Sequence, residues 1–238
     1  GYMTYRLLPS LQFRSEVSAD IMTGNDDQWY GPKTARTISA AANGGYGSSA
    51  WQQTASYSTN QFFNFATNVM EGHALTADFG MSYQYNDYLY TYTDAQRFPN
   101  DSFQRLTSAA EPLTASSTGQ EYSFLSYFLR TNYNIQDKYL VSLSGRLDGS
   151  SRFGADNRYG FFPAGSVGWV ITEESFAEGM LRYVPYLKLR ASYGITGNAG
   201  IVNFGSLGLW GGTAYGGLSG INPTQIPNPN LSWETTRQ

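Results

Sequence analysis

Three stretches with a two-residue hydrophobic period constrain the fold of this chain more than any other feature. In Tyr139–Leu147 every second residue is apolar or Gly, and the residues between them are mostly Ser or Arg. Leu187–Ile195 alternates in the same way, and so does Tyr159–Ile171 apart from Phe162 and Val170. Side chains of a strand alternate between its two faces. Each stretch therefore predicts a strand with one apolar, aromatic-rich face and one polar face.

This alternation fits two classes of protein. In a transmembrane barrel the apolar face contacts lipid and the polar face lines a water-filled interior. In a soluble antiparallel sheet the apolar face packs on a core, and the polar face meets water. The three stretches alone do not separate these classes, so the rest of the chain must decide between them.

The composition favours an all-β protein and excludes several kinds of site. Of the 238 residues only 14% are charged, against about 25% in ordinary soluble domains, and 16% are aromatic, with 19 Tyr. The absence of Cys excludes disulfides, thiolate metal sites and Cys nucleophiles. A net charge of −3 without a basic block argues against a nucleic-acid partner. No apolar run approaches the ~20 residues of a membrane helix, and no signal peptide opens the chain.

The same alternation recurs along the chain and predicts an antiparallel, up-and-down meander of about eight strands. The predicted strands are Leu11–Ile21, Trp51–Val69, Leu75–Tyr85, Tyr122–Ile135, Tyr139–Leu147, Tyr159–Ile171, Leu187–Ile195 and a last one beginning at Leu231. A further short strand is expected near Arg36–Ala40.

The predicted connections alternate between long and short. The long ones are Thr23–Ala50, Asp94–Gly119, Gly149–Arg158 and Gly197–Asn230, and the shorter ones are Met70–Gly72, Gln136–Lys138 and Thr172–Tyr186. One rim of the sheet is therefore elaborate and the other plain. Outer-membrane barrels have this asymmetry, with long loops outside and short turns in the periplasm. It favours a membrane barrel over a soluble β protein.

Several motifs in the second half of the chain carry a family resemblance. They are Asp148-Gly149-Ser150-Ser151-Arg152-Phe153-Gly154, Arg158-Tyr159-Gly160-Phe161-Phe162-Pro163-Ala164, Gly168-Trp169, Leu187-Lys188-Leu189-Arg190, Tyr193-Gly194, Thr196-Gly197-Asn198 and Asn230-Leu231-Ser232-Trp233-Glu234. In content, order and spacing the set resembles the barrel of SusC/RagA-type TonB-dependent transporters of Bacteroidota. Upstream of Gln120 the resemblance lies in the general character of the sequence and not in specific motifs.

The resemblance implies a larger transmembrane barrel of roughly twenty-two strands closed around a plug. Residues 1–238 would then be a partial barrel, without the plug domain and the closing C-terminal strands. It further implies TonB-dependent import of a nutrient oligomer, glycan or peptide, across the bacterial outer membrane. The implied partners are a SusD-like surface lipoprotein, TonB (through a part of the protein not in this chain), outer-membrane lipid and the cargo. No cofactor and no enzymatic activity are implied.

Exposed aromatic residues in the long loops are the candidates for cargo binding. Trp29 and Tyr30 follow Asp27 in the first loop, and Trp210 and Tyr215 lie in the uncharged segment after Thr196. Sugar rings stack on aromatic faces, while neighbouring carboxylates and amides bond hydroxyl groups. The alternative is that these rings only pack the loops together.

Other conspicuous residues favour structural roles. The Asp148–Arg158 loop predicts a structural turn in which Arg152 pairs with Asp156. The single His, His73, has no partners at metal-ligand spacing, so neither a metal site nor a catalytic site is predicted.

Two rival functions remain open. A secreted or cell-surface glycan-binding β protein would bury the apolar strand faces against a second sheet. A β-rich glycoside hydrolase would need two converging carboxylates at about 5–5.5 or about 6.5–9.5 Å, and the sequence offers no convincing pair.

Overall fold

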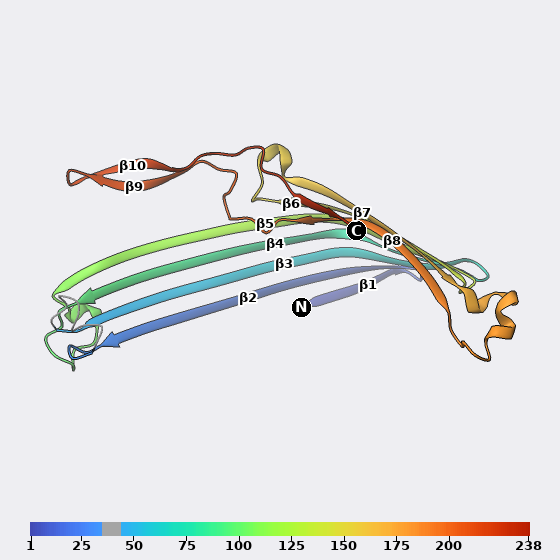
Figure 1. Ribbon diagram of the computed structural model, residues 1–238, viewed down its shortest axis with the longest axis horizontal. Coiled ribbons are helices and arrows are strands. Elements are labelled where there is room, and N and C mark those ends of the chain that lie inside the picture. The colour runs from blue at the N-terminus through green and yellow to red at the C-terminus, as the bar shows by residue number, and fades with distance from the viewer. Residues whose placement is uncertain (35–43) are drawn as a thin grey trace. The chain divides into compact units, whose positions relative to one another are not determined.

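A computed structural model describes residues 1–34 and 44–238, and nearly all of its regular structure is β. Nine strands form one antiparallel sheet in the order β1-β2-β3-β4-β5-β6-β7-β8-β11 (Figure 1). Their bounds are β1 (Tyr2–Leu8), β2 (Leu11–Tyr30), β3 (Tyr46–Met70), β4 (His73–Gln96), β5 (Glu111–Ile135), β6 (Tyr139–Ser150), β7 (Tyr159–Val170), β8 (Lys188–Asn198) and β11 (Glu234–Arg237). From β1 to β8 each strand pairs with the next in sequence, which confirms the predicted up-and-down meander.

A second, two-stranded sheet consists of β9 (Leu209–Tyr215) and β10 (Leu218–Gln225). The remaining regular elements are the 3-10 segments η1 (Leu106–Ser108), η2 (Ala155–Asn157), η3 (Ile171–Glu173) and η4 (Ser175–Met180). None of the helical segments in the described ranges has the length and apolarity that a membrane-spanning helix requires.

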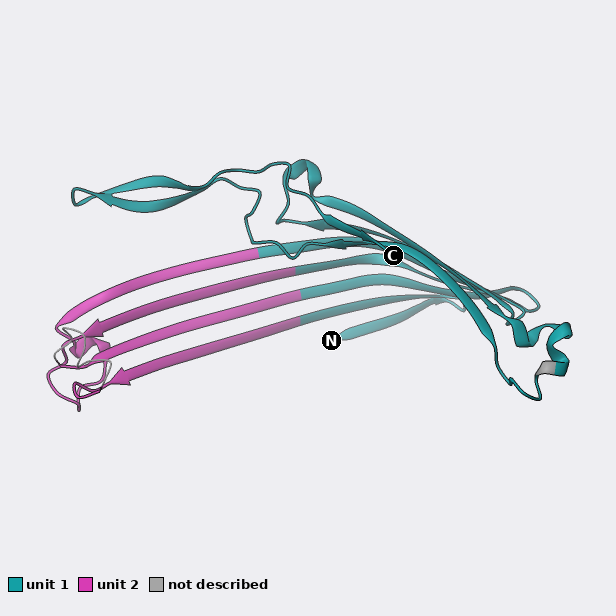
Figure 2. Ribbon diagram, in the orientation of Figure 1, with its two compact units in different colours: residues 1–18, 58–84, 122–238 teal, residues 19–57, 85–121 magenta. Residues whose placement is uncertain are grey.

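The described residues divide into two compact units (Figure 2). Unit 1 comprises Gly1–Ser18, Ser58–Gln84 and Tyr122–Gln238, and unit 2 comprises Ala19–Tyr57 and Tyr85–Glu121. Unit 1 holds the short turns of the meander together with β6, β7 and β8. Unit 2 holds the ends of β2–β5 that lead into the two long connections of the first half of the chain.

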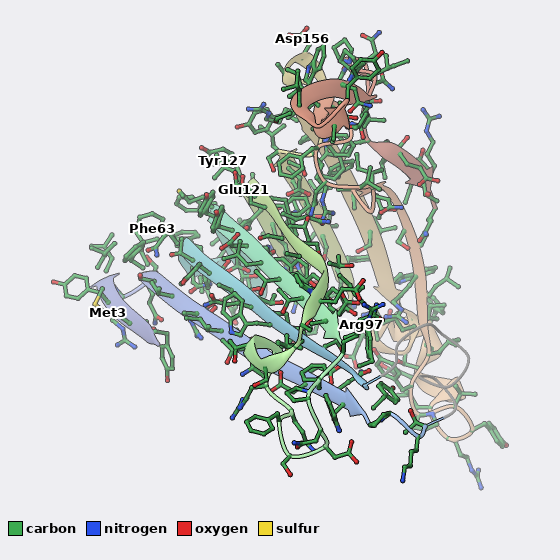
Figure 3. The ribbon with its side chains drawn as sticks, turned by 90° about the vertical axis from the view of Figure 1, so that its left-hand side faces the viewer. Met3, Phe63, Arg97, Glu121, Tyr127 and Asp156 are labelled. Atoms are coloured by element: carbon green, nitrogen blue, oxygen red, sulfur yellow. The ribbon has the colours of Figure 1, made fainter. Side chains whose placement is uncertain are left out.

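In unit 1 the apolar residues gather on one face of the sheet, and that face is uncovered. Ring contacts join Phe13 to Phe63 at 5.1 Å and Phe63 to Phe79 at 5.0 Å. Leu143 is 59% exposed and Leu189 is 63% exposed. Figure 3 shows Met3, Phe63 and Tyr127 along the same side of the strands. A soluble sandwich would bury these side chains against a second sheet. The uncovered apolar face is the arrangement of a membrane wall.

The opposite face of unit 1 is polar, and several of its charged side chains bond to neighbours on the same face. Arg14 Nε lies 2.7 Å from Glu16 Oε1, and Arg146 Nε lies 2.5 Å from Asp148 Oδ1. Arg146 also donates to Ser126 Oγ at 3.0 Å. Such pairing lowers the cost of placing charge on a wall that faces an interior.

Several strands are longer than the sequence predicted. β2 runs on to Tyr30 and β5 begins at Glu111, so Asp27, Trp29 and Tyr30 lie on a strand and not in a loop. In these strands the alternation of apolar and polar residues stops before the strand does. The parts of a strand that lie beyond the lipid do not need an apolar face. A membrane strand needs only about 9–11 residues, whereas β2 has 20 and β5 has 25.

Other expected bounds also change. β1 and the β9–β10 hairpin are strands that the count of eight did not include, and the last strand is limited to Glu234–Arg237. The short strand expected near 36–40 lies outside the described residues. The two rims differ in part as predicted, since the turns after β1, β3 and β5 have two or three residues, while the connections after β2, β4 and β8 are long. The connection after β7, expected among the shorter ones, contains η3 and η4 and is longer than those after β2 and β4.

Candidate functional site

In unit 2, Trp29 packs against the chain that follows β4. Its ring meets Phe98 edge to face at 4.4 Å between centroids, and Phe98 is only 4% exposed. A Cβ on Gly45 would come within 3.1 Å of the Trp29 ring. Trp29 is half-buried, so only part of its surface is free for a ligand. Asp27, two residues earlier on β2, is exposed.

Tyr30 belongs to a cluster of hydroxyl and carboxylate groups at the same end of unit 2. Its ring lies 6.1 Å from that of Tyr46, which is 9% exposed. The Tyr46 hydroxyl donates to Asp94 Oδ2 at 2.9 Å and lies 2.8 Å from the Tyr92 hydroxyl. Burial, the bond to Tyr92 and the nearby Asp94 carboxylate raise the pKa of Tyr46 well above that of an ordinary tyrosine. Tyr46 thus stays neutral and fixes the local structure beside Tyr30.

Trp210 and Tyr215 lie on the β9–β10 hairpin of unit 1 and are far more accessible. Trp210 is 68% exposed and Tyr215 is 87% exposed. Trp210 is paired in register with Pro223, and Tyr215 with Leu218, so each ring has one neighbour across the hairpin and an open outer side. The sequence placed all five candidates in loops. The structure puts three on β2 in unit 2 and two on a hairpin in unit 1, and the two groups differ in exposure.

The Asp-Gly-Ser-Ser-Arg motif is an anchor for the segment that follows β8. Arg152 donates to Asn203 Oδ1 at 2.7 Å and to the Ala199 carbonyl at 2.9 Å, and its guanidinium lies 3.9 Å from the Tyr122 ring centroid. The expected Arg152–Asp156 pair is therefore wrong, because the guanidinium bonds to the 199–203 segment instead. The expected structural role of the motif agrees with these contacts.

The ring of Phe153 completes this anchor. Phe153 is 1% exposed and lies 4.8 Å from Trp233, which in turn lies 5.2 Å from Phe162. Trp233 Nε1 donates to the Arg158 carbonyl at 3.1 Å. The aromatic residues of the motif region thus fasten the 229–233 segment to β7 and do not form a ligand platform.

A row of small polar side chains crosses the inner face of unit 1, and sequence reasoning missed it. Ser142, Ser166 and Ser192 are partners in register on β6, β7 and β8. Ser142 donates to Asn132 Oδ1 at 2.8 Å. These residues line a hollow of about 920 Å³, together with Lys188 and Arg190. Strand register was needed to find the row, since serines spaced along one sequence carry no signal that they meet.

At the short-turn rim, one carboxylate collects three donors. Glu174, between η3 and η4, accepts from the Tyr139 hydroxyl at 2.6 Å and from Trp169 Nε1 at 3.1 Å, and Lys138 Nζ lies 3.5 Å away. These bonds lower the pKa of Glu174, with the Tyr139 bond the largest cause. His73 Nδ1 lies 2.9 Å from the Tyr133 hydroxyl. Across residues 1–34 and 44–238, no group of three or more His, Asp or Glu side chains is placed to hold a metal ion.

Two curated relatives match this chain, one over its whole length and one over part of it. A TonB-dependent receptor of Formosa agariphila is 33% identical over 242 residues, which is all of this chain and 23% of the relative. The TonB-dependent receptor SusC of Bacteroides thetaiotaomicron is 36% identical over 57% of this chain and 14% of its own length. The chain thus spans about a quarter of the first of these relatives.

A solved structure gives the same fold. The RagAB peptide transporter superposes with a TM-score of 0.89 over 99% of this chain and 26% of that one, at 23% identity. The family described as "TonB dependent receptor-like, beta-barrel" matches residues 4–238. Together with the uncovered apolar face and the two unlike rims, this match shows that the chain belongs to the TonB-dependent receptor β-barrel family of the bacterial outer membrane.

Proposed function

We propose that the protein containing this chain imports a nutrient oligomer, a glycan or a peptide, across the outer membrane in a TonB-dependent manner. The observation that carries the proposal is the two-faced sheet of unit 1. Its apolar face is uncovered, as at Leu143 and Leu189, and its polar face carries paired charges and the serine row. A wall of this kind separates lipid from an aqueous interior. It provides a route for a solute.

The partners in this proposal follow from the relatives. SusC is a TonB-dependent receptor, and RagAB is described as a peptide transporter. By analogy, energy would arrive through TonB, acting on a part of the protein outside this chain. A SusD-like surface lipoprotein would cooperate with the long connections to capture cargo.

Within this chain, we assign cargo contact to Trp210 and Tyr215 first, and to Asp27, Trp29 and Tyr30 second. The order follows exposure, because a ring that is 68% or 87% exposed can stack on a sugar or peptide group without disrupting its own packing. Trp29 and Tyr30 already use part of their surface on Phe98 and Tyr46.

Growth of the source bacterium on single oligomers tests the function. Deletion of the gene is expected to abolish growth on one oligomer class while growth on the matching monomer is unchanged. Depletion of TonB should give the same phenotype. A deletion strain that grows normally on every glycan and peptide offered, yet loses surface binding of one glycan, would instead support the rival surface-binding function.

A further inference from the structure

Three cations on the polar face of β5–β8 have no acidic partner. They are Arg130 on β5 and Lys188 and Arg190 on β8, and none forms an ion pair with a carboxylate of the described residues. By contrast, Arg14 and Arg146 on the same face of unit 1 each pair with a neighbouring acid. Arg130 and Arg190 are exposed, and Lys188 is half-buried. This part of the inner wall is therefore positively charged.

Strand register places the cations on both sides of the serine row. Arg190 pairs with Gly168 of β7. Arg130 pairs with Ser144, which in turn pairs with Ala164 of β7. Gly168 and Ala164 are four positions apart, or about 13 Å at the rise of a strand. The serine row crosses the sheet between these two levels, so basic groups flank it above and below.

Gly168 leaves room for the Lys188 side chain to lie across β7. A Cβ at this position would come within 2.9 Å of Lys188 Cε and 3.6 Å of its Nζ. The ammonium group therefore lies near the same glycine that pairs with Arg190. Two like charges at neighbouring positions of the wall repel each other, and an anion bound between them offsets that repulsion.

Two hollows on the polar face connect the cations. The larger one, of about 920 Å³, is lined in part by Lys188 and Arg190, and the smaller one, of about 420 Å³, by Arg130. The serine row belongs to the lining of both hollows and joins them into one cationic trough. Within the described part of the chain, no Asp or Glu side chain lines either hollow.

The lining of the cationic trough indicates the chemistry of its occupant. Hydrogen bonds from Lys and Arg to a carboxylate are charge-assisted and stronger than neutral ones. In the serine row, Ser142 already donates to Asn132, while the hydroxyls of Ser166 and Ser192 line the larger hollow. A sugar offers several hydroxyl groups to such a row, whereas an acidic peptide offers carboxylates but few hydroxyls. A neutral oligomer would leave the three cations unpaired.

We propose that the cationic trough binds the carboxylate groups of an acidic oligosaccharide, which is the cargo that the transporter imports. Lys188 and Arg190 bind one carboxylate, and Arg130 binds another farther along the wall. The serine row bonds the sugar hydroxyls between them. This inference rests on the proposed import function and narrows its cargo from oligomers in general to glycans that contain uronate sugars.

Growth of the gene-deletion strain separates this inference from the function on which it rests. The strain is offered a panel of uronate-containing oligosaccharides, neutral oligosaccharides and peptides, one at a time. We expect growth to be lost on a uronate-containing oligosaccharide and retained on the others. Loss of growth only on a neutral glycan or a peptide would overturn the cargo site but support import. Normal growth on every oligomer would overturn both.

Uptake by whole cells then tests the residues. The probe is the labelled uronate oligosaccharide that the deletion strain cannot use, compared with its methyl ester, which has the same sugars without the charge. Arg190→Gln should raise the half-saturating concentration of the acid about tenfold and leave that of the ester unchanged. Arg190→Lys keeps the charge and should stay close to wild type. Arg182→Gln, at an exposed cation between η4 and β8, should match wild type with both probes.

Another partner for the cations would give a different pattern of uptake. An equal loss for the acid and the ester in Arg190→Gln would overturn the cargo site, because the cations would then pair with carboxylates in a part of the protein outside this chain. Wild-type uptake of the acid by a variant that combines Lys188→Gln with Arg190→Gln would overturn it as well. Immunoblots of outer-membrane fractions, with heat-modifiable migration on gels, confirm that each variant is folded and inserted.

Discussion

The indole of Trp233 lies 4.8 Å from the ring of Phe153, which is almost wholly buried although it stands in a rim connection. This contact closes the segment after β8 onto the Asp-Gly-Ser-Ser-Arg motif. We expect Phe153→Ala to destabilise the closed segment by about 3–5 kcal/mol, the usual cost of emptying an aromatic site. Protease cleavage between residues 199 and 233 should accelerate at least about hundredfold. Phe176→Ala removes a ring that is 71% exposed, and cleavage should stay at the wild-type rate.

Gly154 also allows the segment after β8 to pack against the Asp-Gly-Ser-Ser-Arg motif. A Cβ at this position would overlap the carbonyl of Pro229, and the backbone there cannot move without loosening the anchor. Gly154→Ala should therefore cost about 1–3 kcal/mol through overpacking. Gly212→Ala is the matched control, because a Cβ there meets nothing within 4 Å. Equal thermal stability of the two variants would contradict the contact.

The Tyr46 hydroxyl holds Asp94 and Tyr92 together in unit 2. Tyr46→Phe leaves the ring in place but removes the donor to Asp94 Oδ2, and we expect a loss of about 1–3 kcal/mol. The measurement is thermal unfolding of the full-length protein, with Tyr215→Phe as the exposed control. An unchanged midpoint for Tyr46→Phe would mean that Tyr92, whose hydroxyl lies 3.3 Å from Asp94 Oδ2, satisfies the carboxylate alone.

Glu174 gives the short-turn rim a dependence on pH. Because folding lowers its pKa, the folded state binds fewer protons there than the unfolded state. The stabilisation is present above the unfolded pKa and is lost as the pH falls through the folded pKa. The midpoint of wild-type unfolding should thus drop between neutral and acidic pH by more than that of Glu174→Gln. Glu173→Gln, at an exposed neighbour, should follow the wild-type curve.

Trp210 is the residue whose removal should affect cargo most. Trp210→Ala is expected to weaken cargo binding about tenfold, the loss of one aromatic stacking contact. Binding of fluorescent oligomers to whole cells measures this, and surface antibody staining controls for expression. Trp29→Ala should cost less affinity and more stability, because its ring packs on Phe98. The reverse order would move the cargo contact to unit 2.

The membrane wall was predictable because contact with lipid on one face requires every second residue of a strand to be apolar, and this alternation is visible in the sequence. Leu143, Val167 and Leu189 each occupy the apolar set of their strands, and the structure places all three on the uncovered face. The same physical demand marked which stretches are strands, since a strand without an apolar face cannot span lipid.

Strand segments outside the lipid need no apolar face, so alternation in the sequence does not predict them. Asp27 and Tyr30 belong to β2, although their polar surroundings in the sequence predicted a loop. Both faces of the strand meet water there, so both can carry polar residues. Arg152 was assigned to the wrong partner for a related reason. Its bonds to Asn203 and Ala199 depend on how a distant segment folds back, which local spacing does not encode.

The sequence also did not predict the register in which the strands pair. Ser142, Ser166 and Ser192 lie side by side only because the register of β6, β7 and β8 places them opposite one another. A hollow of about 470 Å³ on the apolar face has the same origin, since Gly165 becomes a gap only when Leu143 and Tyr193 flank it. A shift of one residue would place each of these side chains on the other face.

The tip of the β9–β10 hairpin has a practical consequence. Gly216 and Gly217 both have positive φ, at 58° and 81°, and a Cβ on either would meet nothing within 4 Å. This is the geometry of a tight two-residue hairpin turn, with open space around both glycines. An epitope tag inserted between the two glycines would report on surface exposure in living cells while the anchor at Phe153 and Trp233 stays closed.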